Sequence, residues 1–132
     1  MSKIKTLILS NGELKEKEIN NTLEELQKIV GGYIEIPYLS KVFTKNEIDV
    51  IINEEGKFIE ELKPEIAIID GENEQLLDTV YGNCIFASHD KEGNTTSLNA
   101  EQIKIIEKEL GIELKLMNPK TAEIFKVRAL FI

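Results

Sequence analysis

The sequence predicts an α+β fold, with a mostly antiparallel sheet covered by two main helices and a C-terminal β-hairpin. Short stretches alternate apolar and polar residues, as strands with one buried face do. Turn dipeptides such as Asn11-Gly12 and Asn118-Pro119 separate several of these stretches. Two other segments repeat their apolar residues at helical spacing, and each begins with a capping pattern. Together these patterns favour strands, with helices in second place.

The chain begins with a predicted hairpin that leads into the first helix. Residues 4–9 form a strand, Asn11-Gly12 makes the turn, and the charged stretch 14–19 returns as an edge strand. Asn21 is expected to cap the helix at its start, and Gly31 to end it as a left-handed C-cap.

A second hairpin is predicted in the middle of the chain, after a strand over residues 33–38. Its two strands, 48–52 and 57–59, flank a turn that ends at Gly56, where a positive φ is expected. The segment that follows is less regular, and residues 66–69 are either a short strand or a buried loop.

The last third of the chain contains the second helix and a final hairpin. Residues 83–88 have few charges, which predicts a central strand. Asn99 then caps a helix, with Gln102 in the matching position of a capping box. Residues 112–117 and 124–132 alternate as the two strands of the C-terminal hairpin.

The composition is that of one soluble domain over residues 1–132, with 42% hydrophobic and 30% charged residues. No apolar run approaches the roughly 20 residues of a membrane span. The opening segment lacks the apolar core of a signal peptide. Because Cys84 is the single cysteine, no disulfide forms within the chain, and a cytoplasmic location is expected.

The formal net charge of −8 limits the class of partner. Duplex nucleic acid is disfavoured because phosphate contacts need dense lysine and arginine. The acidity suits a solvated surface, a basic protein partner or mimicry of nucleic-acid charge.

The sequence predicts no catalytic residue, no metal site and no cofactor. Cys84 and His89 are the only soft metal ligands, too few for a zinc site. Cys84 lies within an apolar strand and is expected to be buried and inert. His89 follows five residues later, too far along the strand to activate it. The stretch 90–94 is interpreted as a hairpin turn rather than a calcium loop.

A set of polar and aromatic residues beside glycine turns is predicted to bind a small ligand. Aromatic rings stack on bases, amides and hydroxyls hydrogen-bond to them, and lysine or arginine pairs with phosphate. Ordinary packing or turn formation is the alternative for each. The candidates are Tyr33, Glu35, Lys57, Tyr81, Asn83, His89, Asn94, Thr95, Thr96, Lys126 and Arg128.

The order of motifs resembles an uncharacterised family of small phage, prophage and plasmid proteins. The shared patterns are Leu-Gln-x-x-Val-Gly-Gly followed by Tyr-Ile-Glu, then Asn-Glu-Glu-Gly-Lys, then Gly-Asn before an apolar strand, and an acidic turn leading into Ser-Leu. They lie at residues 26–35, 53–57, 81–87 and 90–98. The resemblance covers about residues 1–110, so residues 111–132 form an extension to a family-like core. Lys63-Pro64-Glu65 replaces the Pro-Pro-Asn stretch of the family.

The resemblance implies a phage-encoded accessory protein of the bacterial host cytosol. Together with the missing catalytic residues, it predicts a non-enzymatic anti-defence protein, a homo-oligomer that binds and sequesters a small nucleotide-derived immune signal. The alternative is an acidic interaction module that inhibits a basic host protein or a DNA-binding protein. A third possibility is an enzyme acting on nucleotides, with His89 as its base.

Overall fold

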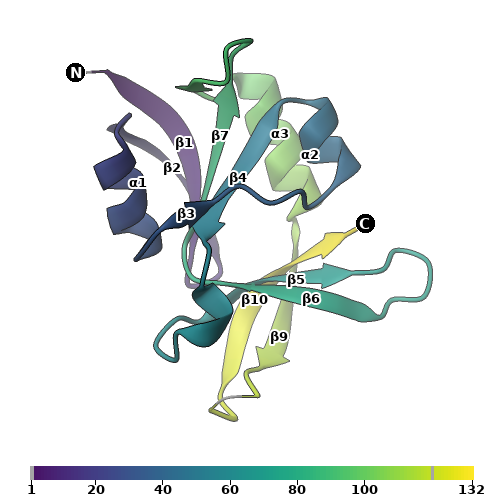
Figure 1. The fold of residues 1–132 in the computed structure, drawn as a ribbon. Coiled ribbons are helices and arrows are strands. Elements are labelled where there is room, and N and C mark those ends of the chain that lie inside the picture. Colours follow the sequence, from purple (N-terminus) through teal and green to yellow (C-terminus); the bar gives the residue numbers. More distant parts are fainter. Residues whose placement is uncertain (1, 120) are drawn as a thin grey trace.

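The computed structural model describes residues 2–119 and 121–132 as two β-sheets with three α-helices beside the first sheet (Figure 1). The first sheet contains β1 (Lys3–Ser10), β2 (Glu13–Asn20), β3 (Ile34–Glu35), β4 (Ile48–Asn53), β7 (Cys84–His89) and β8 (Thr95–Thr96). The second contains β5 (Pro64–Ile69), β6 (Leu76–Tyr81), β9 (Ile112–Met117) and β10 (Ile124–Phe131). The helices are α1 (Leu23–Val30), α2 (Lys41–Lys45) and α3 (Ala100–Glu109), with a 3₁₀ turn η1 (Gly56–Phe58).

The predicted class is correct in outline and wrong in two details. Strands run in the order β2-β1-β7-β4-β3 in the first sheet, where β8 also pairs with β7, and β6-β5-β10-β9 in the second. There are thus two sheets where one was expected, and α2 is a third helix. The pairing of β5 with β10 is parallel, unlike the other pairs. Helix α2 has five residues, too few for an apolar repeat to be visible.

The first hairpin forms as predicted. Asn11 and Gly12 both have positive φ, 54° and 78°, as a type I′ turn requires. Strand β2 lies at the edge of its sheet and β7 lies inside it, which the charges of the one and the apolar character of the other had indicated.

Both predicted helices form, with one change at the start of α1. Its N-cap is Thr22, whose hydroxyl accepts from the Glu25 amide at 3.2 Å. The predicted cap, Asn21, instead donates to the Thr95 carbonyl at 3.0 Å. At the other end, Gly31 is the left-handed C-cap that was predicted, with φ of 83°. The capping box of α3 is complete, because Asn99 and Gln102 each accept from the other's amide at 2.8 and 2.9 Å.

Replacing Asn99 with alanine is expected to lower the free energy of unfolding by about 1 kcal/mol, since an N-terminal amide of α3 then loses its acceptor. Urea denaturation followed by circular dichroism measures the change. Asn99→Asp keeps the acceptor and is the matched control, expected to stay near the parent value. Equal stability of the alanine variant and the parent would contradict a stabilising cap.

The middle of the chain differs most from the prediction. The strand expected over residues 33–38 is limited to β3, and residues 57–59 do not return along β4 as a hairpin. Gly56 lacks the expected positive φ. It is needed for a close approach, because a Cβ at this position would lie 2.6 Å from the Tyr81 carbonyl oxygen. Of the two alternatives for residues 66–69, the strand is correct, and β5 is buried along its whole length.

Apolar side chains fill the space between the two sheets and on both faces of the first. One cluster joins Phe43, Phe86, Ile106 and Leu130 between the first sheet, α2, α3 and the second sheet. Phe43 and Phe86 meet edge to face, with ring centroids 6.0 Å apart. A second cluster packs α1 on the opposite face of the first sheet. The core therefore depends on contacts between segments far apart in the sequence.

The C-terminal hairpin forms as predicted, with β9 antiparallel to β10. Strand β10 also pairs with β5, so it lies inside the second sheet. Val127, Ala129 and Leu130 are 0% exposed. Strand β10 thus contributes to the buried core.

None of the helices in residues 2–119 and 121–132 combines the length and the apolar character that a membrane span requires.

Candidate functional site

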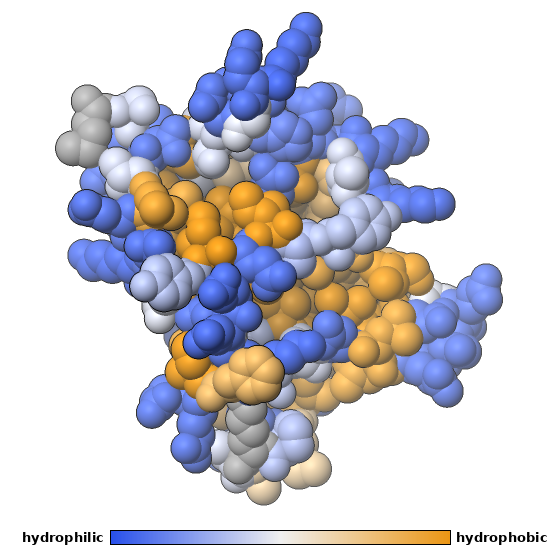
Figure 2. All heavy atoms as spheres, in the orientation of Figure 1, coloured by the Kyte–Doolittle hydropathy of each residue, from blue (hydrophilic) through white to orange (hydrophobic). Residues whose placement is uncertain are grey.

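A surface cavity with a mixed polar and apolar lining lies between the two sheets. It is about 370 Å³ and lies where β3 and β4 approach η1 and β6. We call it the inter-sheet cleft. Its lining residues are Glu35, Pro37, Leu39, Ile52, Asn53, Glu54, Lys57, Phe58, Asp78, Thr79, Val80 and Tyr81. Figure 2 views this face of the molecule, with apolar side chains over both sheets and hydrophilic side chains between them.

The cleft is acidic. Glu35, Glu54 and Asp78 contribute carboxylates, against one cation, Lys57, among the described residues that line it. Lys57 Nζ lies 2.6 Å from Asp78 Oδ1, and both side chains are about half exposed. An exposed pair of this kind contributes little to stability, but it neutralises the lysine. The remaining carboxylates give the cleft a negative potential.

An aromatic ring stands beside these carboxylates. Phe58 belongs to η1 and is 84% exposed. Tyr81, Ile52 and Leu39 provide more deeply set apolar surface. Because water solvates a phenyl ring poorly, this exposure favours a contact with a partner.

Asn53, at the end of β4, positions this part of the cleft. Its side chain is 3% exposed; the amide donates to the Val30 carbonyl at 3.2 Å and its oxygen accepts from the Glu55 amide at 2.8 Å. These bonds connect the end of α1 to the turn that carries η1. Gly56 then allows η1 to lie directly on Tyr81. The motif Asn53-Glu-Glu-Gly56 thus makes this junction and not the hairpin that was predicted.

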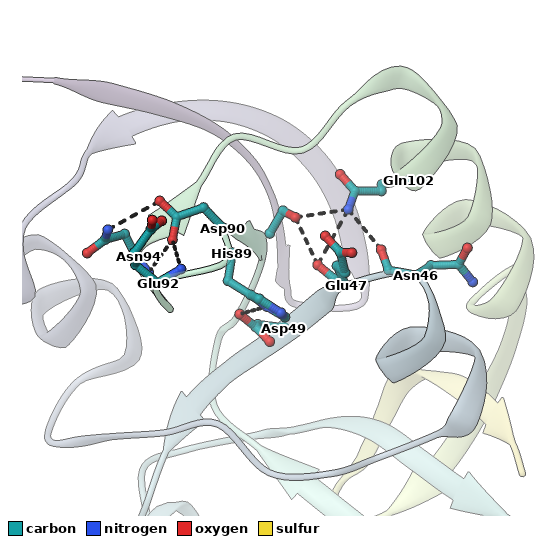
Figure 3. Close-up of polar contacts among 9 residues, drawn as sticks. Asn46, Glu47, Asp49, His89, Asp90, Glu92, Asn94 and Gln102 are labelled. Carbon is teal, nitrogen blue, oxygen red and sulfur yellow. Dashed lines mark hydrogen bonds and ion pairs between the residues drawn. The ribbon is translucent and has the colours of Figure 1, made fainter.

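A second polar group surrounds His89 at the end of β7 (Figure 3). His89 Nδ1 lies 3.0 Å from Asp49 Oδ2 on the neighbouring strand β4, and the pair is partly exposed. Such a pair orients an imidazole. No cavity whose lining is described includes either residue.

Ser88, next to His89, does not complete a nucleophilic arrangement. Its hydroxyl donates to the Glu47 carbonyl at 2.9 Å and accepts from Gln102 Nε2 at 3.0 Å. Gln102 also donates to the Asn46 carbonyl at 2.9 Å (Figure 3). Consecutive residues of a strand point to opposite faces, so Ser88 and His89 are directed apart. The network connects α3 to the loop before β4.

The turn after His89 has the structure of a simple hairpin turn. Asp90 Oδ1 accepts from the amides of Glu92 and Asn94 at 3.0 and 2.9 Å, and Oδ2 accepts from Asn94 Nδ2 at 3.2 Å (Figure 3). The bond from the Asn94 amide is the main cause that lowers the pKa of Asp90. The carboxylate is therefore occupied by its own turn. Within residues 2–119 and 121–132 no three acidic, histidine or cysteine side chains gather around a possible metal position.

Cys84 is buried, as predicted. It is 0% exposed, its thiol donates to the Gly82 carbonyl at 3.5 Å, and burial strongly raises the pKa of the thiol, with Glu65 adding to the effect. The reactive thiolate is thereby disfavoured.

The predicted ligand-binding residues divide into separate groups. Glu35, Lys57 and Tyr81 meet in the inter-sheet cleft. His89, Asn94, Thr95 and Thr96 lie together around the β7–β8 turn. Tyr33 is 71% exposed outside both groups. Asn83 donates to the Ile29 carbonyl at the end of α1, at 3.1 Å.

The two C-terminal cations lie elsewhere, on the second sheet. Lys126 is 3.8 Å from a Glu113 carboxylate oxygen, and Arg128 is 3.3 Å from the other oxygen. Arg128 also donates to the carbonyls of Gly12 and Leu110 at 2.8 and 3.0 Å. Arg128 thus connects the first hairpin and the end of α3 to the second sheet. The single pocket that the sequence suggested is not assembled within the chain.

Sequence reasoning missed several residues of these groups. Asp49 was marked by being the one acidic residue in an apolar strand, and Phe58 by following a glycine turn. Asp78 carried no signal, because the segment before it shows no clear periodicity.

Comparison with known proteins places the chain in a family. The family model described as Domain of unknown function (DUF3846) matches residues 4–111. No curated protein and no solved structure matches the chain. Because the match spans most of its length, the chain belongs to the DUF3846 family, whose domain is of unknown function.

Proposed function

We propose that this protein is a non-catalytic binding module whose inter-sheet cleft takes a basic, partly apolar segment of another protein. The observation that carries the proposal is the lining of the cleft. Three carboxylates stand beside an exposed phenyl ring, and the lysine among them is already paired with Asp78. A lysine or arginine side chain of a partner satisfies both features, since its charge meets the carboxylates and its stem packs on the ring.

The overall charge supports the same class of partner. At −8 the chain attracts a basic protein over a distance and orients its approach. The volume of about 370 Å³ is within the range of sites that accept one small molecule or a few side chains. This proposal takes up the interaction-module alternative drawn from the sequence.

Sequestration of a nucleotide-derived signal has less support from the geometry. Phosphate needs a cation that is free to bind it. Lys57 is paired with Asp78, while Lys126 and Arg128 contact Glu113 and do not line the cleft. Nucleotide binding and an anti-defence role in a phage therefore stay predictions, which the experiment below separates from peptide binding.

Neutralising the cleft is expected to weaken binding of a basic peptide by roughly threefold to a hundredfold. The variant is Glu35→Gln, Glu54→Gln and Asp78→Asn. Three partly exposed charge contacts, at roughly 0.2–1 kcal/mol each, correspond to this loss. The probe is a fluorescein-labelled peptide that alternates arginine with leucine, and its polarisation is measured at two salt concentrations.

The matched control changes the same number of charges away from the cleft. Glu16→Gln, Glu18→Gln and Glu101→Gln alter exposed side chains of β2 and α3. This triple variant is expected to keep nearly all of the affinity, because distant charges are screened. Equal weakening by the two triple variants would remove the cleft from the proposal.

The single variant Asp78→Asn separates peptide from nucleotide binding. It frees Lys57 from its ion pair. Peptide affinity is expected to fall, whereas an ADP-ribose or cyclic dinucleotide probe would bind more tightly if the cleft served phosphate. A tighter nucleotide complex together with an unchanged peptide complex would favour the sequestration alternative.

A further inference from the structure

The two sheets differ in how their edges are protected from pairing with another strand. Strand β2 carries alternating lysine and glutamate, and β3 and β8 are two residues long. Strand β6 pairs with β5 through two register shifts. Charge, shortness and irregularity are the usual protections of an edge. Strand β9 has six residues and an unbroken register with β10, so among the described edges it is the one that is neither short, irregular nor charged at successive positions.

The side chains of β9 separate into two faces. Leu114 and Leu116 belong to a cluster whose members all come from the second sheet, including Phe125 and Val127. No helix contributes to that cluster within the described chain. Glu113 and Lys115 point to the opposite face, since strand residues alternate. Ile112 and Met117, at the two ends of the strand, are 53% and 60% exposed.

The backbone of β9 presents alternate residues to the free edge. The Asn118 amide donates to the carbonyl of Glu123, the residue opposite it, at 2.8 Å. In an antiparallel ladder, hydrogen-bonded and non-hydrogen-bonded pairs alternate. Counting back from Asn118, Leu114 and Leu116 direct their backbone groups to β10. Glu113 and Lys115 therefore direct theirs outward.

We propose that two copies of this chain associate through β9, paired antiparallel across a two-fold axis with Leu114 opposite Leu114 of the second copy. In this register Glu113 faces Lys115 of the second copy, and the reverse contact forms by symmetry. Ile112 faces Leu116 of the second copy, so apolar side chains meet on one face and opposite charges on the other.

The charges of β9 select this register. A two-fold axis at residue 113 would place two glutamates opposite each other, and an axis at residue 115 would place two lysines together. Like charges directly opposite each other destabilise a strand pair. The two-fold axis must also pass through a residue and not between two residues, because a shift by one residue would pair side chains that point to opposite faces of the sheet.

A second copy fits this edge better than an unrelated strand does. Glu113 and Lys115 lie two residues apart with opposite signs, which makes the strand complementary to itself, as an isologous interface requires. Two chains of charge −8 repel each other. Strand β9, with one glutamate and one lysine, is an edge at which they meet without adding net repulsion.

A cysteine at the axis tests the register. Leu114 would form a non-hydrogen-bonded pair, with Cα atoms about 4.5 Å apart, which suits a disulfide. Leu114→Cys is expected to form a covalent dimer under mild oxidation, seen on a non-reducing gel. Ile112→Cys is the matched control, because four residues of strand, about 13 Å, separate its two copies. Cys84 is 0% exposed and gives no background.

Charge reversal tests the same pairing in solution. Sedimentation equilibrium of the parent chain is expected to give twice the mass of 15.0 kDa. Lys115→Glu places glutamates opposite each other twice and should weaken the dimer at least tenfold. Lys104→Glu makes the same charge change on exposed α3 surface and should not. Circular dichroism verifies that both variants fold.

Three results would each overturn the proposal. They are a parent chain that stays monomeric at the highest concentration reached, equal cross-linking at positions 112 and 114, and a Lys115→Glu dimer as stable as that of the parent. The cysteine result remains decisive if the charge variant fails to fold.

Discussion

Ending the chain after Gly111 is expected to abolish cooperative folding, although the family match ends at that residue. The deletion removes β9 and β10, and with them Val127 and Leu130, which are 0% exposed. Burial of each such side chain contributes about 1.5–3 kcal/mol. Their sum approaches the total of about 5–15 kcal/mol that stabilises a typical domain.

The deletion also exposes what β10 covers. Ile66 and Ile68 share a cluster with Leu130 between the sheets, and β5 would lose its parallel partner. The carbonyls of Gly12 and Leu110 would lose Arg128 as their donor. We therefore expect a chain that binds hydrophobic dye and unfolds without a sigmoidal transition in urea, followed by circular dichroism.

A shorter deletion is the control. Ending the chain after Leu130 removes Phe131 and Ile132, which are 38% and 51% exposed. It breaks the two backbone bonds that Ile132 makes with Ile69 and Gly71, so a loss of about 2 kcal/mol with cooperativity retained is expected. A sigmoidal transition for residues 1–111 would instead make β9 and β10 an independent addition to a stable core.

The sequence correctly predicted the elements that form through contacts between residues close together in the chain. The Asn11-Gly12 turn, the capping box at Asn99 and the C-terminal hairpin each depend on residues within about twenty positions of one another. Alternation reports which face of a strand is buried, but not which strand lies beside it. For that reason the parallel pairing of β5 with β10, more than fifty residues apart by their numbers, and the division into two sheets were not foreseen.

The candidate site was predicted only in part for the same reason. Glu35, Lys57 and Tyr81 come together because β6 approaches β4, and the segment that contains β6 has no pattern of its own. The candidate cations were assigned to phosphate binding because a chain this acidic contains few of them. In a chain with 24 acidic and 16 basic residues, however, a cation usually finds a carboxylate of the same chain and is then not free for a phosphate. Lys57, Lys126 and Arg128 each lie beside a carboxylate of the chain itself.

Glu65 joins the two sheets at the first hairpin, and its substitution is expected to have a large effect on stability. It lies on β5 and is 2% exposed. Its two oxygens accept from the amides of Asn11 and Gly12 at 2.8 and 2.9 Å. Arg128 Nε binds the Gly12 carbonyl from the second sheet at 2.8 Å. The turn of the first sheet is thus held through both the amide and the carbonyl of Gly12.

Glu65→Ala is expected to lower the free energy of unfolding by about 2–5 kcal/mol at neutral pH. The buried Gly12 amide and the part-buried Asn11 amide would lose their acceptors, at roughly 1–3 kcal/mol each. Glu65→Gln keeps one acceptor and turns an amide group toward the other donor, so a smaller loss is expected. Urea denaturation of the three chains measures both. A loss below about 1 kcal/mol for alanine would mean that water replaces the carboxylate at the turn.

The pH dependence of the same comparison tests the electrostatics of the turn. Burial is the main influence on Glu65 and raises the pKa of its carboxyl, against the bonds from Gly12 and Asn11 and the charge of Lys63, which lower it. A folded-state pKa above the unfolded value means that the folded chain holds its proton more tightly. This contribution to stability is complete below the pKa of the unfolded chain, about 4.3. It is lost as the pH rises through the pKa of Glu65 in the folded chain.

The stability advantage of the parent over Glu65→Gln should therefore shrink as the pH rises above about 4.3. Other titrating groups are common to both chains and cancel in the difference. If the advantage over Glu65→Gln instead grew with pH, the two amide donors would outweigh burial. The turn would then hold a carboxylate whose pKa is lowered, and the hairpin would act as an anion-binding loop for β5.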